Sequence, residues 1–343
     1  MQSVDVSEWT VDEQFSPYPE GSRDKYALIS PSDCAFPGIV PDHRYLLKFS
    51  NPRYPVQFWS EIVAYRIADL MGVPAPKCFL SCDPNSGQPG SLTSWFYGKQ
   101  IEADAPCPPG LVAKSENGGG QDVEDGLAPE DAPHTYSLYV PGSSYMARFI
   151  EDYDFKKGRQ HNLKTLRNFV ARLRMKYGID YWPLWSMYFI FDAIIGNTDR
   201  HQDNWGVLWR RDQTGNLNPR FAPAFDNGTS LLHEILDRKL PAFQDHEVRL
   251  RYISRGRHHL RADRDAANQL GHLELLSLIL EARPDLSSYM KPCCEFSSDA
   301  LAEQVSSLCE VDCPVPLTSE RAQAMIAIVE ERRRIIRDEI LID

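Results

Sequence analysis

The feature that most constrains the fold is a run dominated by large apolar residues, YWPLWSMYFIFDAIIG, at positions 181–196. A helix that is apolar on nearly all sides must be buried on nearly all sides, so the run predicts a central helix. No apolar stretch reaches the roughly 20 residues that cross a bilayer. The start, MQSVDVSEWTVDEQF, lacks the basic region and apolar core of a signal peptide. We therefore expect a cytoplasmic protein, acting in its own cell or delivered into a host cytosol.

A dense polar loop, GNTDRHQDN, follows this helix directly at positions 196–204. Taken singly, an aspartate here is more often a turn residue or a helix cap. Asp199 and Asn204 are five residues apart, however, and protein kinases place a catalytic aspartate and a metal-binding asparagine at this spacing. The spacing makes Asp199 the candidate catalytic base and Asn204 a candidate metal ligand.

The segment after the loop predicts a β-hairpin that leads to a second acidic position. WGVLWR and LNPRFAPAF flank the turn-forming sequence RDQTGN, and Asp226-Asn227-Gly228 follows. Kinases hold Mg²⁺ with an Asp-x-Gly at this place. Carboxylate and amide oxygens are the ligands that Mg²⁺ prefers, so Asp226 and Asn204 are the predicted metal ligands. Together with Asp199 they form the predicted catalytic set.

The first hundred residues predict a small β-rich lobe with one helix. The helix covers 57–72, where Phe58 and Ile62 begin an apolar stripe and Gly72 ends it. Short apolar and aromatic runs bounded by turn residues predict strands at 25–30, 44–50, 77–82 and 91–97.

Three features of this lobe suit the phosphates of ATP. A glycine-containing turn can present backbone N–H groups, and its candidate residues are Gly21, Ser22, Arg23, Asp24 and Lys25. Lys48 would supply a point charge, and Glu61 in the helix would hold that lysine extended. Simpler readings stay open for both: an edge-strand lysine that deters aggregation, and a surface glutamate on an amphipathic helix.

The other polar side chains of the loop have less specific readings. His201 fits a buried histidine that hydrogen-bonds the loop backbone better than it fits a base, because Asp199 already fills that role. Arg200 suits either phosphate binding or ordering of the loop, and Asp203 suits a solvent-facing acid. The pair His258-His259 lies among arginines, so we expect it on the surface or beside the substrate rather than at a metal.

In chain order, GSRDK, YLLKF, SEIVAYRIADLMGVPAP, IIGNTDRHQDNWGVL and FAPAFDNGTSL resemble the HipA-like serine/threonine kinases, in a stand-alone form of the kinase-like domain. The most specific part is GNTDRHxxN followed by an APxYD-like segment. The resemblance implies an α+β, protein-kinase-like bilobal fold with a small β-rich lobe and a larger helical lobe. It implies ATP and Mg²⁺ as cofactors and γ-phosphate transfer to serine or threonine of a protein substrate. A toxin or effector kinase with an antitoxin-like partner is the biological setting that it suggests.

The resemblance also assigns residues. It makes Lys48 the nucleotide-phosphate lysine, Glu61 its partner, and the 21–25 turn the phosphate loop. The hinge that contacts the nucleotide would be SWFY (94–97), with Trp95, Phe96 and Tyr97, or alternatively YMARF (145–149). Many family toxins carry a phosphorylatable serine three residues before the loop glycine. Tyr18 occupies that position here, so Ser22 and Ser16 are the autophosphorylation candidates.

Residues 102–134 separate the two predicted lobes. They are rich in glycine, proline and acids, contain a single lysine, and predict a flexible acidic insertion or linker. The expected domains are 1–99 for the small lobe, 100–136 for the insertion, and 137–343 for the helical lobe with the catalytic loop and the metal-binding hairpin.

Charge and cysteine content limit the other classes. A net charge of −11 argues against a dedicated nucleic-acid binder, although 249–261 is a local basic stretch. Cys78 and Cys82, like Cys309 and Cys313, are four apart and lack the two-residue gap of most zinc knuckles, so free thiols are the expectation.

Three other functions stay open. A small-molecule or phosphoinositide-type phosphotransferase fits the loop nearly as well. A non-catalytic nucleotide-binding regulator fits less well, because the acid, amide and lysine set is intact. A metal-dependent hydrolase built on Asp199, His201, Asp203 and Asp226 would leave Lys48 and GSRDK unexplained.

Overall fold

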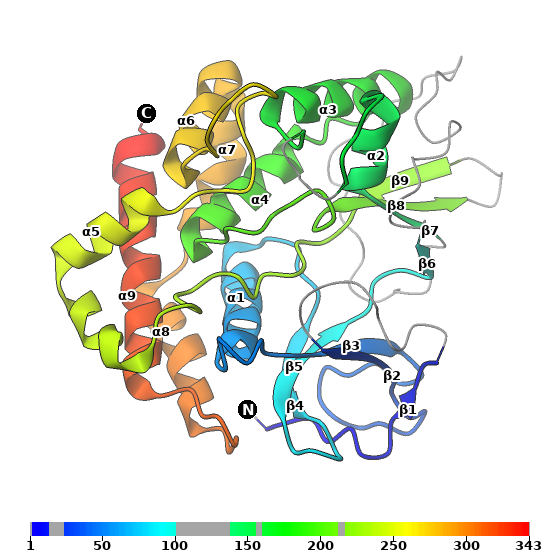
Figure 1. Ribbon diagram of the computed structural model, residues 1–343, viewed down its shortest axis with the longest axis vertical. Coiled ribbons are helices and arrows are strands. Elements are labelled where there is room, and N and C mark those ends of the chain that lie inside the picture. The colour runs from blue at the N-terminus through cyan, green and yellow to red at the C-terminus, as the bar shows by residue number, and fades with distance from the viewer. Residues whose placement is uncertain (1, 14–23, 101–137, 156–159, 212–216, 343) are drawn as a thin grey trace. The chain divides into compact units, whose positions relative to one another are not determined.

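The computed structural model describes residues 2–13, 24–100, 138–155, 160–211 and 217–342 (Figure 1). The chain divides into two compact units, each assembled from separate parts of the sequence. Unit 1 contains Met1–Trp95, Asp226–Ser254 and Cys294–Asp338, and unit 2 contains Phe96–Phe225, Arg255–Cys293 and Glu339–Asp343. The predicted domain limits at residues 99 and 137 stay a prediction, and most of the acidic insertion lies outside the described residues.

Unit 1 is built on an antiparallel sheet of strand order β1-β2-β3-β5-β4. The strands are β1 (Thr10–Val11), β2 (Lys25–Ile29), β3 (Arg44–Phe49), β4 (Cys78–Cys82) and β5 (Pro89–Ser94). The four strands predicted from the sequence are confirmed, with β5 beginning and ending a little earlier than expected. Strand β3 is central, and its register pairs Lys48 with Lys25 on one side and with Ser91 on the other. An edge-strand role for Lys48 is therefore wrong.

Apolar residues cover both the sheet and the helix that follows β3. Trp9 packs edge-on against Tyr45, with ring centroids 5.3 Å apart, beside the buried Leu47. The predicted helix is α1 (Gln57–Met71), and it packs against β4 and β5. It ends where Gly72 adopts a left-handed conformation and donates its N–H to carbonyls of the last turn.

The rest of unit 1 is helical. It contains α5 (His246–Arg255, of which the last residue belongs to unit 2), α8 (Ser298–Ser306) and α9 (Ser319–Ile335). Shorter 3-10 segments of unit 1 are η4 (Asp237–Gln244) and η7 (Ser307–Glu310). Two further segments cross the limits of the unit: the 3-10 segment η6 (Pro292–Cys294), of which only Cys294 belongs to unit 1, and the π segment η8 (Ile336–Ile340), whose last two residues belong to unit 2. Helix α8 packs against α1, and the Trp59 indole N–H donates to the Val315 carbonyl at 2.8 Å. The helical C-terminal segment therefore completes the core around α1.

Unit 2 combines a small sheet with the predicted central helix. The sheet has the order β6-β7-β8-β9, with strands β6 (Lys99–Gln100), β7 (Leu138–Pro141), β8 (Gly206–Arg211) and β9 (Leu217–Phe221). The β8–β9 hairpin confirms the prediction. Strand β7 lies in a region expected to be mostly helical, and it pairs with β8 at one edge and with β6 at the other.

The helices of unit 2 surround α4 (Trp182–Ile195), in which twelve of fourteen residues are buried. The others are α2 (Gly142–Phe149), α3 (Leu163–Tyr177), α6 (His272–Ala282), α7 (Ser287–Met290) and the 3-10 segment η5 (Pro284–Leu286). Pro183 lies in the first turn of α4, and Gly196 ends the helix in a left-handed conformation, as its place before the polar loop predicts. Within the described part of the chain, no helix combines the length and apolarity needed to cross a bilayer.

Candidate active site

Lys48 in unit 1 meets the aspartate of the predicted Asp-x-Gly. Its Nζ lies 3.1 Å from Asp226 Oδ1, and the Lys48 side chain is 9% exposed. A lysine this deeply buried needs a compensating charge, and Asp226 supplies it. Two residues that the sequence assigned separately to phosphate and metal binding therefore lie in contact.

Glu61 is buried and belongs to the same group. It is 3% exposed, which contradicts the reading of a surface glutamate. Its Oε1 accepts the backbone N–H of Asn227 at 2.8 Å, one residue after Asp226. Glu61 of α1 thus holds the backbone of the Asp-x-Gly at Asn227. Lys48 of β3 holds the neighbouring Asp226.

Asp226 adopts a backbone conformation that few residues accept. Its φ is +55°, in the left-handed region, where aspartate is tolerated better than most non-glycine residues. Such conformations persist where the surroundings hold them, and here the Lys48 and Glu61 contacts do so. The Asp226 side chain remains 31% exposed, so it is partly accessible from solvent.

The loop after α4, in unit 2, is held by hydrogen bonds around Asp199. Its N–H donates to Asn197 Oδ1 at 3.0 Å, and its carbonyl accepts His201 N–H at 2.8 Å and Asn204 Nδ2 at 2.8 Å. Because the amide nitrogen of Asn204 is used in this way, its amide oxygen is the atom that could take a cation. Asp199 and Asn204 are thus brought together, as their spacing predicts.

A buried ion pair lies beneath this loop. Asp192 and Arg200 are both fully buried, and the guanidinium contacts the carboxylate through Nη2 at 2.8 Å and Nε at 3.0 Å. The remaining Nη1 donates to the carbonyls of Asn204 and Phe225, at 3.1 and 2.6 Å. Arg200 is therefore inaccessible to phosphate and orders the loop, which decides between its two sequence-based readings.

Two histidines complete the buried network. His258 Nε2 lies 3.3 Å from Asp192 Oδ2, and His272 Nε2 lies 2.7 Å from the Asn197 carbonyl. The expectation that His258 lies on the surface is wrong: it is fully buried, because residues alternate inward and outward along this segment. Burial would raise the pKa of Asp192, but the charge of Arg200 and the bonds from His258 and Arg200 together hold it well below its usual range.

Sequence reasoning missed Asp192, His258 and His272 as parts of the site. One signal was available, because Asp192 is the single charged residue of an otherwise apolar helix, and a buried carboxylate requires partners. His258 lies 66 positions from Asp192 and His272 lies 75 positions from Asn197, so neither histidine belongs to a local pattern.

The remaining loop residues are more exposed. His201 is 29% exposed, and its Nδ1 accepts the Asp203 backbone N–H at 3.1 Å, so it shapes the loop as expected while being less buried than expected. The Asp203 side chain is 42% exposed, in keeping with a solvent-facing acid.

The predicted phosphate loop and hinge are described only in part. Gly21, Ser22 and Arg23 lie outside the described residues, as do Ser16 and Tyr18. Asp24 precedes β2, and its carbonyl accepts the Phe49 N–H at 3.0 Å, which places the start of β2 beside the end of β3.

The aromatic segment predicted as the hinge spans the limit between the units. Trp95 closes unit 1 with its ring under the Arg44 guanidinium at 5.3 Å. Phe96 and Tyr97 belong to unit 2, where Tyr97 stacks on Tyr139 with centroids 5.0 Å apart and Phe96 contacts Phe225. The nucleotide role of these aromatics, and that of the alternative segment 145–149, stays a prediction.

The donor set suits Mg²⁺. Asp226 offers a carboxylate on a partly accessible side chain and Asn204 an amide oxygen, which are hard oxygen ligands. Among the described residues, no group of three or more histidine, cysteine, aspartate and glutamate side chains is arranged to hold a metal. Each of the two predicted donors is of the kind that Mg²⁺ prefers, and their joint binding of one ion stays a prediction.

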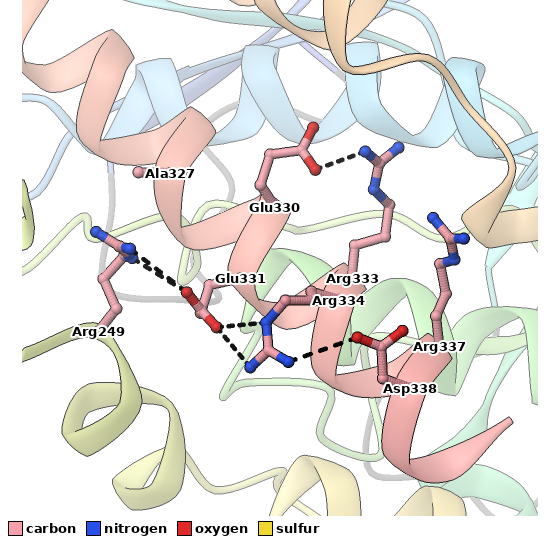
Figure 2. A pocket seen from close by; sticks show the side chains of 8 residues that line it. All are labelled: Arg249, Ala327, Glu330, Glu331, Arg333, Arg334, Arg337 and Asp338. Atoms are coloured by element: carbon pink, nitrogen blue, oxygen red, sulfur yellow. Dashed lines mark hydrogen bonds and ion pairs between the residues drawn. The ribbon is translucent and has the colours of Figure 1, made fainter. Parts of the chain in front are cut away.

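A cavity of about 500 Å³ lies elsewhere in unit 1, at the end of α9 (Figure 2). Its charged side chains already pair with one another: Glu331 with Arg249 and Arg334, Glu330 with Arg333, and Arg334 with Asp338. The paired carboxylates leave little net charge for a triphosphate. None of the predicted site residues lines this cavity.

Comparisons with known proteins bear on the fold that carries these residues. No family model matches the sequence, and no curated protein matches it either. The structure is similar to that of the Helicobacter pylori proinflammatory kinase CtkA, with a TM-score of 0.64 and 16% identity over 97% of this chain and 94% of CtkA. It is also similar to HipA of Shewanella oneidensis, in a toxin–antitoxin complex with HipB and operator DNA, with a TM-score of 0.51 and 12% identity over 92% of this chain and 64% of HipA. The protein therefore has the α+β fold of the HipA-like kinases, which confirms the fold and the resemblance expected from its motifs.

Proposed function

We propose that this protein is a Mg²⁺-dependent kinase that transfers the γ-phosphate of ATP to serine or threonine of a protein substrate. The observation that carries the proposal is the contact between Lys48 and Asp226, at 3.1 Å. A strand lysine and the aspartate of an Asp-x-Gly are the two charges that kinases place at the phosphates and their metal.

Each proposed role follows from the contacts of the residue. Asp199 would accept the proton of the attacking hydroxyl, since its backbone is fixed by three hydrogen bonds and its side chain is only half-buried. Lys48 would bind the phosphates, and Glu61 would hold the Asp226 segment in place through Asn227. Asn204 and Asp226 would hold Mg²⁺, which, when bound, neutralises charge on the phosphates.

Incubation of the purified protein with labelled ATP and Mg²⁺ tests the assignment of the base. We expect Asp199→Ala to lower phosphate transfer by about 10²–10⁴-fold while nucleotide affinity stays within a few-fold. Asp203→Ala, in the same loop but solvent-facing, is the matched control and should transfer phosphate normally. Full transfer by Asp199→Ala would show that another group is the base.

The same experiment separates the alternative functions. Nucleotide binding without transfer to any acceptor would favour the non-catalytic regulator, and transfer only to lipids or small molecules would favour the other phosphotransferases. Phosphate release from esters without ATP would favour the hydrolase. Phosphoproteomics of cells expressing the wild type or Asp226→Ala would identify the protein substrate and the phosphorylated residue type.

An antitoxin-like partner is a further part of the proposal. Its support is the similarity to HipA, which was solved in complex with HipB and operator DNA. Growth arrest on expression of the wild type, absent with Asp199→Ala and relieved by a gene expressed alongside it in its native genome, would support this role. Normal growth with wild-type protein would oppose it.

A further inference from the structure

Helix α3 carries a concentration of positive charge that the proposed chemistry does not use. Its fifteen residues include Lys164, Arg167, Arg172, Arg174 and Lys176 and not one acid, in a chain whose net charge is −11. Its apolar face, with Leu166, Phe169 and Leu173, is buried.

The exposed face of α3 has a central strip, polar in its first half and apolar in its second, between two rows of cations. At 100° per residue, Lys164, Asn168, Ala171 and Met175 follow one another along the middle of this face. Arg167 and Arg174 lie on one side of this strip, and Arg172 and Lys176 on the other. Met175 is 80% exposed, an unusual position for a large apolar side chain.

These cations have few carboxylate partners. Among the described residues, Lys164, Arg167 and Arg172 take part in no ion pair, and Arg174 lies 3.8 Å from Asp180. Arg167 and Arg172 are nevertheless held in place, by the Leu278 carbonyl at 3.3 Å and by the Phe149 ring at 4.6 Å. The contrast with α9 is clear, because two of the arginines in that helix, Arg333 and Arg334, pair with Glu330 and Glu331 of the preceding turn (Figure 2).

Helix α3 is firmly attached to the loop that carries Asp199 and Asn204. Asn162 caps its start, and Leu163 N–H donates to the Arg261 carbonyl at 2.9 Å. Its buried Phe169 packs against Trp205, with centroids 5.3 Å apart, and Trp205 directly follows Asn204. The basic face and the predicted catalytic loop therefore belong to one packed body, unit 2.

We infer that the exposed face of α3 is a docking surface for an acidic segment of the protein substrate, an inference that rests on the proposed function for the identity of the partner. Cations in two rows suit carboxylates, and an accessible methionine suits an apolar anchor among them. A 15-residue helix is about 22 Å long, which matches roughly seven residues of extended peptide. Nucleic acid suits this face less well, because the footprint is one helix and the rest of the chain is acidic.

Binding of a short fluorescent peptide of glutamates and serines around one leucine tests the surface in the absence of ATP. Lys164→Glu with Arg172→Glu should weaken binding about tenfold, and the milder glutamine pair should weaken it less, with unchanged thermal unfolding. The matched control reverses two exposed cations of unit 1, Arg251→Glu with Arg337→Glu, which changes the net charge equally and should leave affinity within about twofold. Added salt should weaken wild-type binding and have less effect on the α3 variants.

Equal losses in the α3 and control variants would overturn the docking surface, because they would reflect overall charge alone. Tighter, α3-dependent binding of a single-stranded oligonucleotide of matched charge would overturn the choice of partner.

A second measurement adds Mg²⁺-ATP to the same protein and peptide. Phosphorylation of the peptide with a higher KM and unchanged kcat in the α3 variants supports the whole inference. Peptide binding without phosphorylation of any protein would retain the surface and reject the proposed kinase function.

Discussion

Asp192 and Arg200 form an ion pair in which neither side chain has any exposed surface, eight residues apart across the end of α4. The remaining hydrogen-bonding capacity of the guanidinium is directed at two backbone carbonyls, those of Asn204 and Phe225. Asn204 is a predicted metal ligand, and Phe225 immediately precedes another. The ion pair thus fixes the backbone at two places where the proposed chemistry needs a defined oxygen.

Replacing Asp192 with asparagine should strongly destabilise the protein. The change leaves Arg200 as a buried cation without its counter-charge, so we expect a loss of about 3–5 kcal/mol in the free energy of unfolding, measured by urea titration. The control is Asp285→Asn, which breaks the exposed pair between Asp285 and Arg283 and should cost less than about 1 kcal/mol. Similar losses for the two variants would contradict the structural role of the buried pair.

Two substitutions at Asp226 should differ in stability only because the backbone there has a positive φ. Asp226→Gly and Asp226→Ala both remove the partner of Lys48, but only glycine accepts a φ of +55° without strain. We expect the glycine variant to be more stable than the alanine variant by about 1 kcal/mol in chemical unfolding. Both should fail to bind Mn²⁺, used as a paramagnetic substitute for Mg²⁺. An alanine variant as stable as the glycine variant would be inconsistent with the left-handed conformation.

The protein should lose stability in mildly acidic solution because of buried histidines. Burial, with the nearby rings of His201 and His258, lowers the pKa of His259 to about 4. Burial also lowers the pKa of His161, whose ring lies 5.8 Å from that of His259.

Stability falls as the pH falls because the unfolded chain binds protons that the folded chain does not. An unfolded histidine binds a proton below pH ~6.5, whereas folded His259 resists protonation until about pH 4, so stability falls as the pH drops between these values. The loss from this residue is roughly 3 kcal/mol at most. Urea unfolding of the wild type and of His259→Asn from pH 7.5 to pH 4 measures it. The variant should show a shallower slope, and an unchanged slope would contradict the assignment. Asp192 adds to the loss only below about pH 5, where an unfolded aspartate begins to bind a proton that the folded residue, with its lowered pKa, does not bind. This loss is common to the wild type and His259→Asn, so it cancels in the comparison.

Adding one methyl group at Gly142 should disturb the predicted catalytic loop through Gln202 and Trp205. A Cβ there would lie 2.2 Å from Trp205 Cε2 and 2.5 Å from the Gln202 carbonyl oxygen, which is too close for any real contact. We expect Gly142→Ala to cost about 1–3 kcal/mol in unfolding free energy and to shift tryptophan fluorescence. Gly271→Ala is the control, because its Cβ would meet nothing closer than 3.5 Å. Equal stability of the two variants would argue against the close packing of Trp205 on Gly142.

The parts of the fold that were predictable are those determined by local patterns. The apolar stripe and Gly72 located α1, and the all-apolar run and Gly196 located α4, because both periodicity and left-handed stops are properties of neighbouring residues. The contact of Lys48 with Asp226 was implied only by the order of motifs.

The features that the sequence did not predict depend on contacts between residues far apart in the chain. His258 was expected on the surface because of its arginine neighbours, yet the partner that buries it, Asp192, is 66 positions away. Strand β7 was overlooked because four residues carry too little pattern to show that they pair with β8 across 65 or more positions of chain. Burial of this kind is decided by tertiary packing, which overrides the local preference of a short segment.

The composition of unit 1 from three distant segments affects how the protein is made. The indole of Trp59 is hydrogen-bonded to a carbonyl 256 positions later, and α8, which packs against α1, begins only at Ser298. At about 5–20 residues per second, a ribosome adds that stretch of chain in roughly 10–50 s. During this interval the nascent sheet and α1 have emerged while the apolar surface meant for α8 remains uncovered. Chaperone binding to the growing chain, and aggregation of fragments that end before residue 294, follow from the same delay.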